Sequence, residues 1–336
     1  MSLSPAPIQE VRDADAGQVL AETNGRADPV VFRGLCTHWP LVERAGDSNA
    51  TERYLLEHYN QAPVTAFLAA AESEGRIFYN DDISALNFRQ VRIGLDQVLT
   101  EIRQSNTQSP PPTVYMGSMA LDHCLPAIKM DNSLPDGGLA ASVRIWMGNR
   151  SRVATHHDIM DNIACVCAGR RKFTLFPPDQ TANLYLGPID MTPAGQQVSL
   201  VDPETPDLKR FPRYEQAVAT ALCAELEPGD AIYIPAMWWH QVNALAPFNI
   251  LINHWWRDLP AFMGAPGDVL LHAILSLRDL PPRQRDAWRK LFEHYIFDPP
   301  EDALDHLPEQ SRGILGELDE NLARQLRMNL RNRLNR

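Results

Sequence analysis

Two histidines and an aspartate in this sequence have the types and the spacing of a metal-binding group. His156 and Asp158 lie two positions apart in the segment 153–162. On a β-strand, side chains at positions i and i+2 point to the same face, so this imidazole and this carboxylate would face a common point. His240 follows two tryptophans much further along the chain and could supply a second imidazole from a neighbouring strand. We therefore predict that these three residues bind a metal ion and form the catalytic centre.

The sequence around these residues narrows the kind of metal site. Two imidazoles and one carboxylate on one side of a metal, with the other positions open, are typical of non-haem Fe(II) sites. A His-x-Asp tripeptide also arises by chance, so the flanking motifs carry the argument. Gly169 opens a charged and then apolar run that ends in two prolines, and 228–235 is a turn with a short β-rich run that leads to His240. Another β-rich run, 250–252, ends at Asn253.

Taken in order, these motifs resemble the jumonji-C branch of the cupin superfamily, and most closely the cupin-like subgroup that includes the asparaginyl hydroxylase of hypoxia-inducible factor. The shared pattern is His-x-Asp, an Asn four residues on, Gly-x-Lys/Arg before a strand ending Leu-Phe-Pro-Pro, Pro-Gly-Asp…Ile-Pro…Trp-Trp-His, and a final Asn-x-Trp. The subgroup often begins with a segment like 29–35 followed by His38-Trp39-Pro40. The resemblance thus covers about residues 29–258.

This resemblance implies a mainly β fold with flanking helices, built on a double-stranded β-helix (a jelly roll of the cupin and jumonji-C type). We divide the chain into an N-terminal α/β region at 1–112, the β-helix core at 113–258 and a C-terminal helical segment at 259–336. The core contains an insertion at 179–224, which separates Asp158 from His240. Long segments of this kind often form lids or binding loops, and a solvated decoration is the alternative.

The resemblance also implies that Fe(II) works with 2-oxoglutarate as co-substrate and with O2. The distal carboxylate of 2-oxoglutarate needs a fixed cation, and an Arg guanidinium can pair with a carboxylate through two hydrogen bonds. By register with the family, Arg171 occupies the position usually held by Lys, and Lys172 is its neighbour. Because alternate residues of a strand face opposite sides, only one of them can point inward. We choose Arg171 as the residue that binds the co-substrate.

Three further residues are predicted to bind the co-substrate because they match the family pattern. Tyr115 lies at about the distance before His-x-Asp at which the subgroup has a tyrosine that helps to hold the 2-oxoglutarate carboxylate. A tyrosine packed in the core is the alternative. Asn162 and Asn253 match the two asparagines of the pattern, and their amides would bond the co-substrate or orient the metal-bound groups. A purely structural amide is the alternative for each.

Composition and charge narrow the classes of partner and location. The 336 residues are 44% hydrophobic and 22% charged, which is ordinary for a soluble globular protein. The net charge of −11 argues against a nucleic-acid backbone as the main partner. No apolar run approaches the roughly 18 residues that span a bilayer, and the first residues lack the pattern of a secretory signal. Because the five cysteines are scattered and odd in number, they suit free thiols in a reducing cytoplasm. We therefore predict a cytoplasmic protein with neither a nucleic-acid nor a membrane partner.

A leucine stripe near the C-terminus suggests a way of assembly. Leucines between Leu315 and Leu334 recur at spacings of three and four, which predicts one helix with an apolar face. Such a face usually packs on the protein's own core, but in the resembling group C-terminal helices often build a dimer interface. We predict a homodimer through residues beyond about 265.

The function that these expectations favour is an Fe(II)- and 2-oxoglutarate-dependent oxygenase, most simply a hydroxylase. It would convert 2-oxoglutarate to succinate by oxidative decarboxylation while oxidising a protein, peptide or small-molecule substrate. Two alternatives stay open: a cupin-fold metal-dependent isomerase or hydrolase, and a non-catalytic metal-binding regulatory module. The identity of the substrate, and hydroxylation as against demethylation, also stay open.

Overall fold

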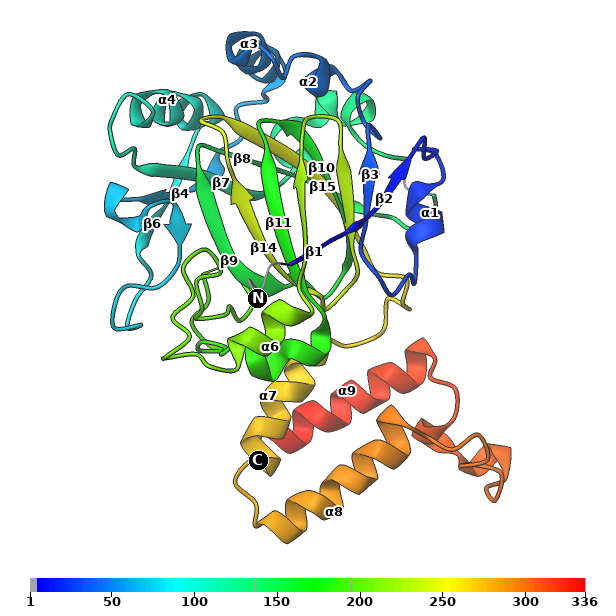
Figure 1. Cartoon of the computed structure of the whole chain (residues 1–336). Helices are drawn as coiled ribbons and strands as arrows, with labels where there is room; N and C mark the ends of the chain where they lie inside the picture. Colours follow the sequence, from blue (N-terminus) through cyan, green and yellow to red (C-terminus); the bar gives the residue numbers. More distant parts are fainter. Residues whose placement is uncertain (1–4, 136, 194, 336) are drawn as a thin grey trace. The chain divides into compact units, whose positions relative to one another are not determined.

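The computed structural model describes residues 5–135, 137–193 and 195–335. Its contacts divide the chain into two compact units, one that ends at Arg257 and one that begins at Asp258. In Figure 1 the first unit runs from blue to yellow and contains all the labelled strands, and the second contains the helices α7, α8 and α9. Each unit is described here by itself.

Two β-sheets form the centre of the first unit (Figure 1). In spatial order the smaller sheet consists of β1 (Ala6–Pro7), β12 (Leu222–Leu226), β11 (Arg171–Phe176), β14 (Trp239–Ala244), β9 (Ser151–His157) and β5 (Arg76–Ile77). The larger sheet consists of β2 (Gln9–Arg12), β3 (Val30–Arg33), β13 (Ala231–Ile234), β10 (Asp161–Ala168), β15 (Asn249–Trp256), β8 (Ser142–Gly148), β7 (Thr113–Ala120), β4 (Val64–Ala69) and β6 (Phe88–Ile93). From β8 to β11 successive strands alternate between the sheets, and the neighbouring core strands pair antiparallel. The predicted mainly β jelly roll with helices is confirmed.

Strand β10 shows why this sequence builds a layered structure. Its alternate residues Ile163, Cys165 and Cys167 pack into a core that also contains residues of the N-terminal helices. The intervening Ala164 and Val166 belong to a second core, which includes apolar residues of both sheets. Because successive side chains of a strand point to opposite faces, a strand covered on both sides must be apolar at nearly every position. The cysteines fill space there, and all five cysteines of the chain are free thiols.

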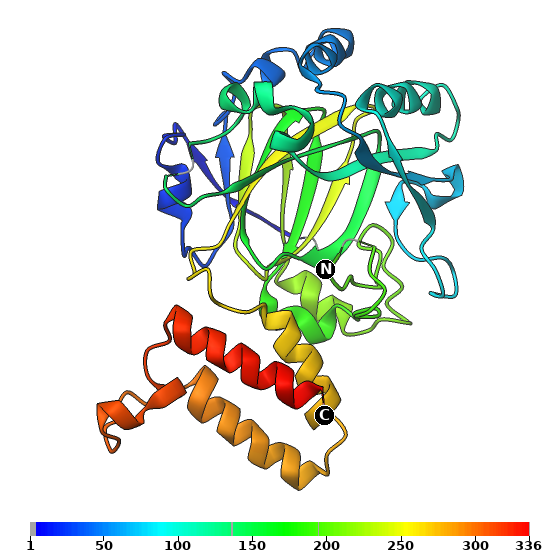
Figure 2. The same cartoon turned by 180° about the vertical axis from the view of Figure 1, so that it is seen from behind.

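Short helices cover the outer face of the larger sheet, and their apolar residues complete the first core. Figure 2 shows the same unit from behind. The α-helices are α1 (Val19–Thr23), α2 (Pro40–Glu43), α3 (Ser48–His58), α4 (Leu95–Ser105) and α5 (Leu121–Cys124), with 3-10 turns at Ala71–Ser73, Pro126–Ile128 and Met130–Asn132. Asp47 begins α3 by accepting hydrogen bonds from the backbone N–H groups of Asn49 and Ala50.

The predicted insertion is a packed layer rather than a solvated decoration. It contains the 3-10 helix η4 (Pro178–Asn183) and α6 (Tyr214–Ala219), and residues 222–224 of the predicted range belong to strand β12. A third core joins it to the smaller sheet. The buried residues of that core are Phe176, Leu184, Val201, Phe211, Tyr214, Ala217, Ala221 and Trp239.

The second unit is helical. Its elements are α7 (Pro266–Leu277), α8 (Pro282–Phe292), the π-helix η5 (Glu293–Phe297), the 3-10 turns η6 (Glu309–Ser311) and η7 (Gly313–Leu315), and α9 (Glu320–Leu334). The prediction of one helix from Leu315 was wrong at its start. Asp319 caps α9 by accepting a hydrogen bond of 2.8 Å from the Leu322 N–H, and Leu315 lies in the preceding 3-10 turn. Among the described residues, no helix is both long and apolar enough to cross a membrane.

Candidate metal centre

The structure brings the three predicted metal ligands together. His156 lies near the end of β9, Asp158 follows that strand, and His240 lies on the adjacent β14 in direct register with His156. One possible ligand atom from each of the three residues lies within 4.8 Å of the others. The His240 Nε2 and Asp158 Oδ2 atoms are 3.6 Å apart. A strand pair and the i, i+2 spacing therefore suffice to build the cluster.

The hydrogen bonds of the two histidines prepare them to bind a metal. The Nδ1 of His156 lies 2.8 Å from the Ala154 carbonyl, and that of His240 lies 3.0 Å from the Trp238 carbonyl. Because a carbonyl only accepts, each Nδ1 carries the hydrogen and each Nε2 keeps its lone pair for a ligand. Burial, followed by the neighbouring His156, lowers the pKa of His240 to about 4, so this ring is neutral at pH 7, as a ligand must be. The donor set of two nitrogens and one carboxylate fits Fe(II).

One cavity of about 390 Å³ contains the cluster and the four residues predicted to bind the co-substrate. Its lining includes His156, Asp158, His240, Arg171, Tyr115, Asn162 and Asn253. The structure thus places all seven side chains around one cavity, and the roles assigned to them stay predictions.

Arg171 is a buried cation that lines this cavity and forms no ion pair among the described residues. Its side chain lies on β11, the residue is only 3% exposed, and its Nε has no hydrogen-bond partner. Burial lowers the pKa of its guanidinium, and among the described residues no carboxylate forms an ion pair with it. Lys172 contacts the insertion, where its Nζ lies 3.2 Å from a carboxylate oxygen of Glu204. Since an unpaired buried charge is costly, Arg171 is suited to receive an anion from outside the protein.

The remaining predicted residues are neutral and largely fixed. Burial raises the pKa of Tyr115 well above its usual range, so its phenol keeps its proton and can donate a hydrogen bond. The Nδ2 of Asn253 donates to Asn162 Oδ1 at 3.0 Å, and its Oδ1 accepts from Trp146 Nε1 at 2.7 Å. This chain of hydrogen bonds sets the orientation of both amides. Trp146 is a cavity residue for which the sequence analysis assigned no role at the site.

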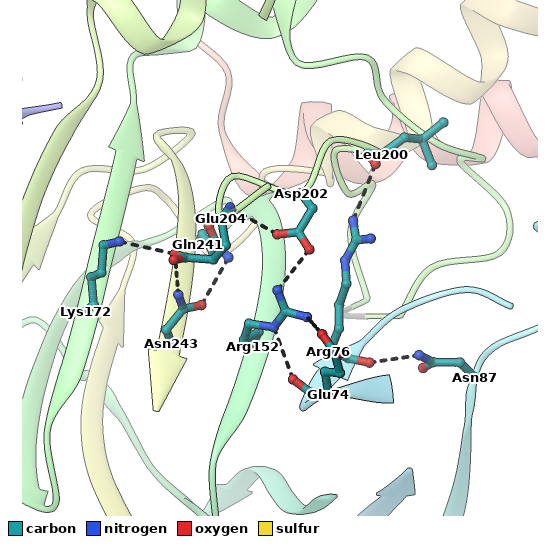
Figure 3. Close-up of polar contacts among 10 residues, drawn as sticks. All are labelled: Glu74, Arg76, Asn87, Arg152, Lys172, Leu200, Asp202, Glu204, Gln241 and Asn243. Carbon is teal, nitrogen blue, oxygen red and sulfur yellow. Dashed lines mark hydrogen bonds and ion pairs between the residues drawn. The ribbon is translucent and has the colours of Figure 1, made fainter. Parts of the chain in front are cut away.

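Polar side chains of the smaller sheet hold the insertion in place (Figure 3). The Asn243 Nδ2 and Lys172 Nζ atoms lie 2.8 and 3.2 Å from Glu204 Oε1, and Arg152 contacts Asp202 at 2.9 Å. These sheet residues belong to β14, β11 and β9, the same strands that carry the cavity cation and both histidines. The insertion also reaches the cavity, where Thr192, Pro193, Gly195 and Val198 form part of the lining.

The sequence analysis also missed the part of the cavity that comes from the N-terminal region. Phe67 of β4 and Phe88 and Gln90 of β6 line it, next to Gly117 of the core strand β7. These are ordinary strand residues in the sequence. They reach the site because β4 pairs with β7 on one side and with β6 on the other. No short sequence motif predicts these pairings.

Comparison with known proteins identifies relatives of this arrangement. The family model of the cupin-like domain matches residues 16–262, well over half of the chain. The lysine-specific demethylase JMJ31 of Arabidopsis thaliana is 26% identical over 68% of this chain and 46% of its own length. Jumonji C domain-containing protein 5 of Drosophila melanogaster is 25% identical over 68% of this chain and 54% of its own. The tRNA wybutosine-synthesizing protein 5 of Danio rerio is 35% identical over 32% of this chain and 30% of its own.

The chain spans about half of the length of these curated relatives, or less. The family match nevertheless includes both sheets from β3 onward and all the residues of the metal cluster. The chain therefore belongs to the cupin-like family of jumonji-C proteins.

Proposed function

We propose that the protein is an Fe(II)- and 2-oxoglutarate-dependent oxygenase, and that it hydroxylates its substrate. The observation that carries this proposal is the unpaired guanidinium of Arg171 in the same cavity as the His156, Asp158 and His240 cluster. A dicarboxylic keto acid has one end that can chelate a metal and another that needs a cation. The cavity provides for both ends.

Each side chain has a definite task in this proposal. The two histidines and Asp158 would hold Fe(II), which when bound supplies the one-electron and O2 chemistry that side chains cannot perform. Arg171 would bind the distal carboxylate through charged hydrogen bonds, and the protonated phenol of Tyr115 would donate another. Asn162 and Asn253 would orient the co-substrate, because their mutual hydrogen bond keeps both amides fixed.

The same observations weigh against the two alternatives. A metal-dependent isomerase or hydrolase has no general need for a buried cation aimed at a second carboxylate. A metal-binding regulatory module without turnover would use the two histidines, but it has no need for an unpaired buried cation in the same cavity. Both alternatives also leave the cost of burying Arg171 without a compensating ligand.

The proposed substrate is a protein, a peptide or a small molecule. Relatives are named for demethylation of lysine and for synthesis of tRNA wybutosine, and this chain spans only part of them. The expectation that no nucleic acid binds rests on the net charge of −11 and stays a prediction.

We also propose that the second unit mediates a homodimer. Among its described residues, the buried hydrophobic residue is Ala323 alone. Leu275 of α7 is 78% exposed and Phe297 of η5 is 70% exposed. Helices of this length are marginal in water without a packed face, so a second copy of the chain would supply the missing surface.

Anaerobic titration with Fe(II) and 2-oxoglutarate tests the proposed function. We expect a weak visible charge-transfer band that requires both components and that Arg171→Met shifts to higher 2-oxoglutarate concentration. Admission of air should then yield succinate, measured by NMR. Absence of the band at saturating metal would refute the proposal and favour one of the two alternatives.

A further inference from the structure

We propose that the cavity receives one uncharged, apolar amino-acid side chain of the substrate, in an aromatic subsite beside the metal cluster. The catalytic role of this subsite rests on the proposed function. In that function, the side chain bound here would be the group that is oxidised.

The subsite is defined by an aromatic wall of five rings: Phe88, Phe67, Tyr115, Trp146 and Trp255. All five side chains line the cavity. In this order the neighbouring ring centroids are 5.0, 6.1, 6.1 and 5.7 Å apart, so each ring contacts the next. Phe88 and Phe67 are half-buried. The wall therefore offers a continuous apolar surface to whatever occupies the cavity.

Gly117 keeps this wall uncovered. A Cβ atom at this position would lie 3.0 Å from the Phe67 ring and 3.2 Å from the Tyr115 ring, with the Trp146 ring at 3.5 Å. Any larger residue would therefore stand against the rings and occupy the space before them. The absence of a side chain at Gly117 makes room for a side chain that comes from another molecule.

A local irregularity of β7 places Gly117 there. The pairing of β7 with β8 shifts register between Met116 and Met119, as in a β-bulge, and Ser118 has a φ of 48°. Arg144 holds this backbone, because its guanidinium donates a hydrogen bond of 2.8 Å to the Ser118 carbonyl. Bulges of this kind commonly re-aim residues next to active sites.

The charges of the cavity argue for an uncharged guest. Among the described residues that line it, the charged side chains are Asp158 and Arg171, and the proposed function assigns both of them. A charged substrate group would thus enter an apolar space without a counter-ion, at a high cost of desolvation. An aliphatic or aromatic group would lose no hydrogen bonds and would cover the rings.

A methylated lysine is the competing guest, because aromatic rings can bind quaternary ammonium groups. A cage for such a cation needs ring faces on several sides. Here the Phe67 and Tyr115 rings are inclined by 31° and the Tyr115 and Trp146 rings by 27°, whereas Phe88 stands at 65° to Phe67 and Trp255 at 87° to Trp146. Among the described lining residues the one carboxylate is the predicted metal ligand Asp158, so no further anion accompanies the rings. The cavity therefore favours an apolar group over a methylated cation.

Binding of small probes tests the inference. The probes are the N-acetyl methylamides of glycine, leucine, phenylalanine and Nε-trimethyllysine, titrated by NMR into the full chain without added metal. The titration is repeated under nitrogen with Mn(II) and 2-oxoglutarate. We expect the leucine or phenylalanine probe to bind at least about tenfold more tightly than the glycine and trimethyllysine probes (about 1.4 kcal/mol).

Two variants locate the binding. Gly117→Leu should abolish the preference by filling the space before the wall. Phe88→Glu should reverse the preference. A carboxylate in the wall would attract the positively charged trimethyllysine probe and would make the wall less favourable for an apolar one. Arg89→Glu is the matched control, since Arg89 is the exposed neighbour of Phe88 on the same strand, and it should leave the preference unchanged.

The outcomes separate this inference from the proposed function. Tightest binding of the trimethyllysine probe to the unaltered protein would overturn the inference and identify a methylammonium site. Equal binding of all four probes would overturn it as well, since the wall would then take no side chain. A normal Fe(II)–2-oxoglutarate band with either result would leave the proposed function standing. An apolar preference without that band would refute the oxygenase and keep the apolar subsite.

Discussion

Replacing Arg171 by methionine should change ligand affinity and protein stability in opposite directions. The guanidinium is buried, and its Nε has no partner in the ligand-free protein. A charged hydrogen bond contributes about 1.5–3 kcal/mol, so Arg171→Met should weaken 2-oxoglutarate binding by roughly 10- to 150-fold. The same change removes an unpaired buried charge, and methionine can fill much of the volume. Unfolding of the ligand-free protein should then cost about 1–4 kcal/mol more than in the unaltered chain.

Lys172→Met is the matched control for this experiment. Lys172 is the next residue of β11, and its ion pair with Glu204 is partly exposed, with side-chain exposures of 30% and 36%. Such a pair contributes about 0–1 kcal/mol, and the side chain contacts the insertion instead of lining the cavity. This variant should therefore bind 2-oxoglutarate normally.

Two measurements on each variant decide the matter: calorimetric titration with 2-oxoglutarate in the presence of Mn(II), and urea unfolding without ligand. The reasoning fails if Arg171→Met keeps its affinity, or if Lys172→Met loses as much. A loss of both affinity and stability in Arg171→Met would show that Arg171 stabilises the fold and is not an unpaired cation that an anion must neutralise.

Three further predictions concern other parts of the protein. Alanine at any one of the three predicted metal ligands should abolish tight Fe(II) binding in a metal analysis, and normal stoichiometry in His240→Ala would disprove the cluster. Burial lowers the pKa of His254 from 6.5 to about 4, so the stability that depends on its neutral ring is complete above pH 6.5 and is lost as the pH falls toward 4, by roughly 3 kcal/mol. In urea unfolding at pH 7 and pH 5, His254→Gln should show a smaller loss than the unaltered protein, and an equal loss would contradict this assignment. Leu326→Arg on α9 should yield monomers in sedimentation, whereas the exposed neighbour Gln325→Arg should not, and an unaltered protein that is monomeric at micromolar concentration would refute the dimer.

The parts of the site that could be predicted from the sequence are those set by local geometry. His156 on β9 and Asp158 just after it meet at one point because of their spacing, and Arg171 faces the cavity while Lys172 does not because a strand alternates. The prediction of where α9 begins was wrong for a related reason. An apolar stripe records which face of a helix is buried but not where the helix begins, and here the cap at Asp319 decides the boundary.

The aromatic subsite could not be predicted in this way, because its residues meet through pairings between distant segments. Phe67 lies opposite Tyr115 only because β4 pairs with β7 in that register, and Phe88 follows because β6 pairs with β4. A shift of one residue in either pairing would turn these rings to the other face of the sheet. The metal cluster, in contrast, needs a single pairing, that of β9 with β14, between motifs that already contain its ligands. Short sequence motifs therefore predict the metal ligands of such a protein. The shape of its substrate subsite depends instead on the register between strands that are distant in the sequence. For the same reason, relatives that share the His-x-Asp and Trp-Trp-His motifs can differ at the wall, and Gly117 is the position at which we expect that difference to alter which side chain is accepted.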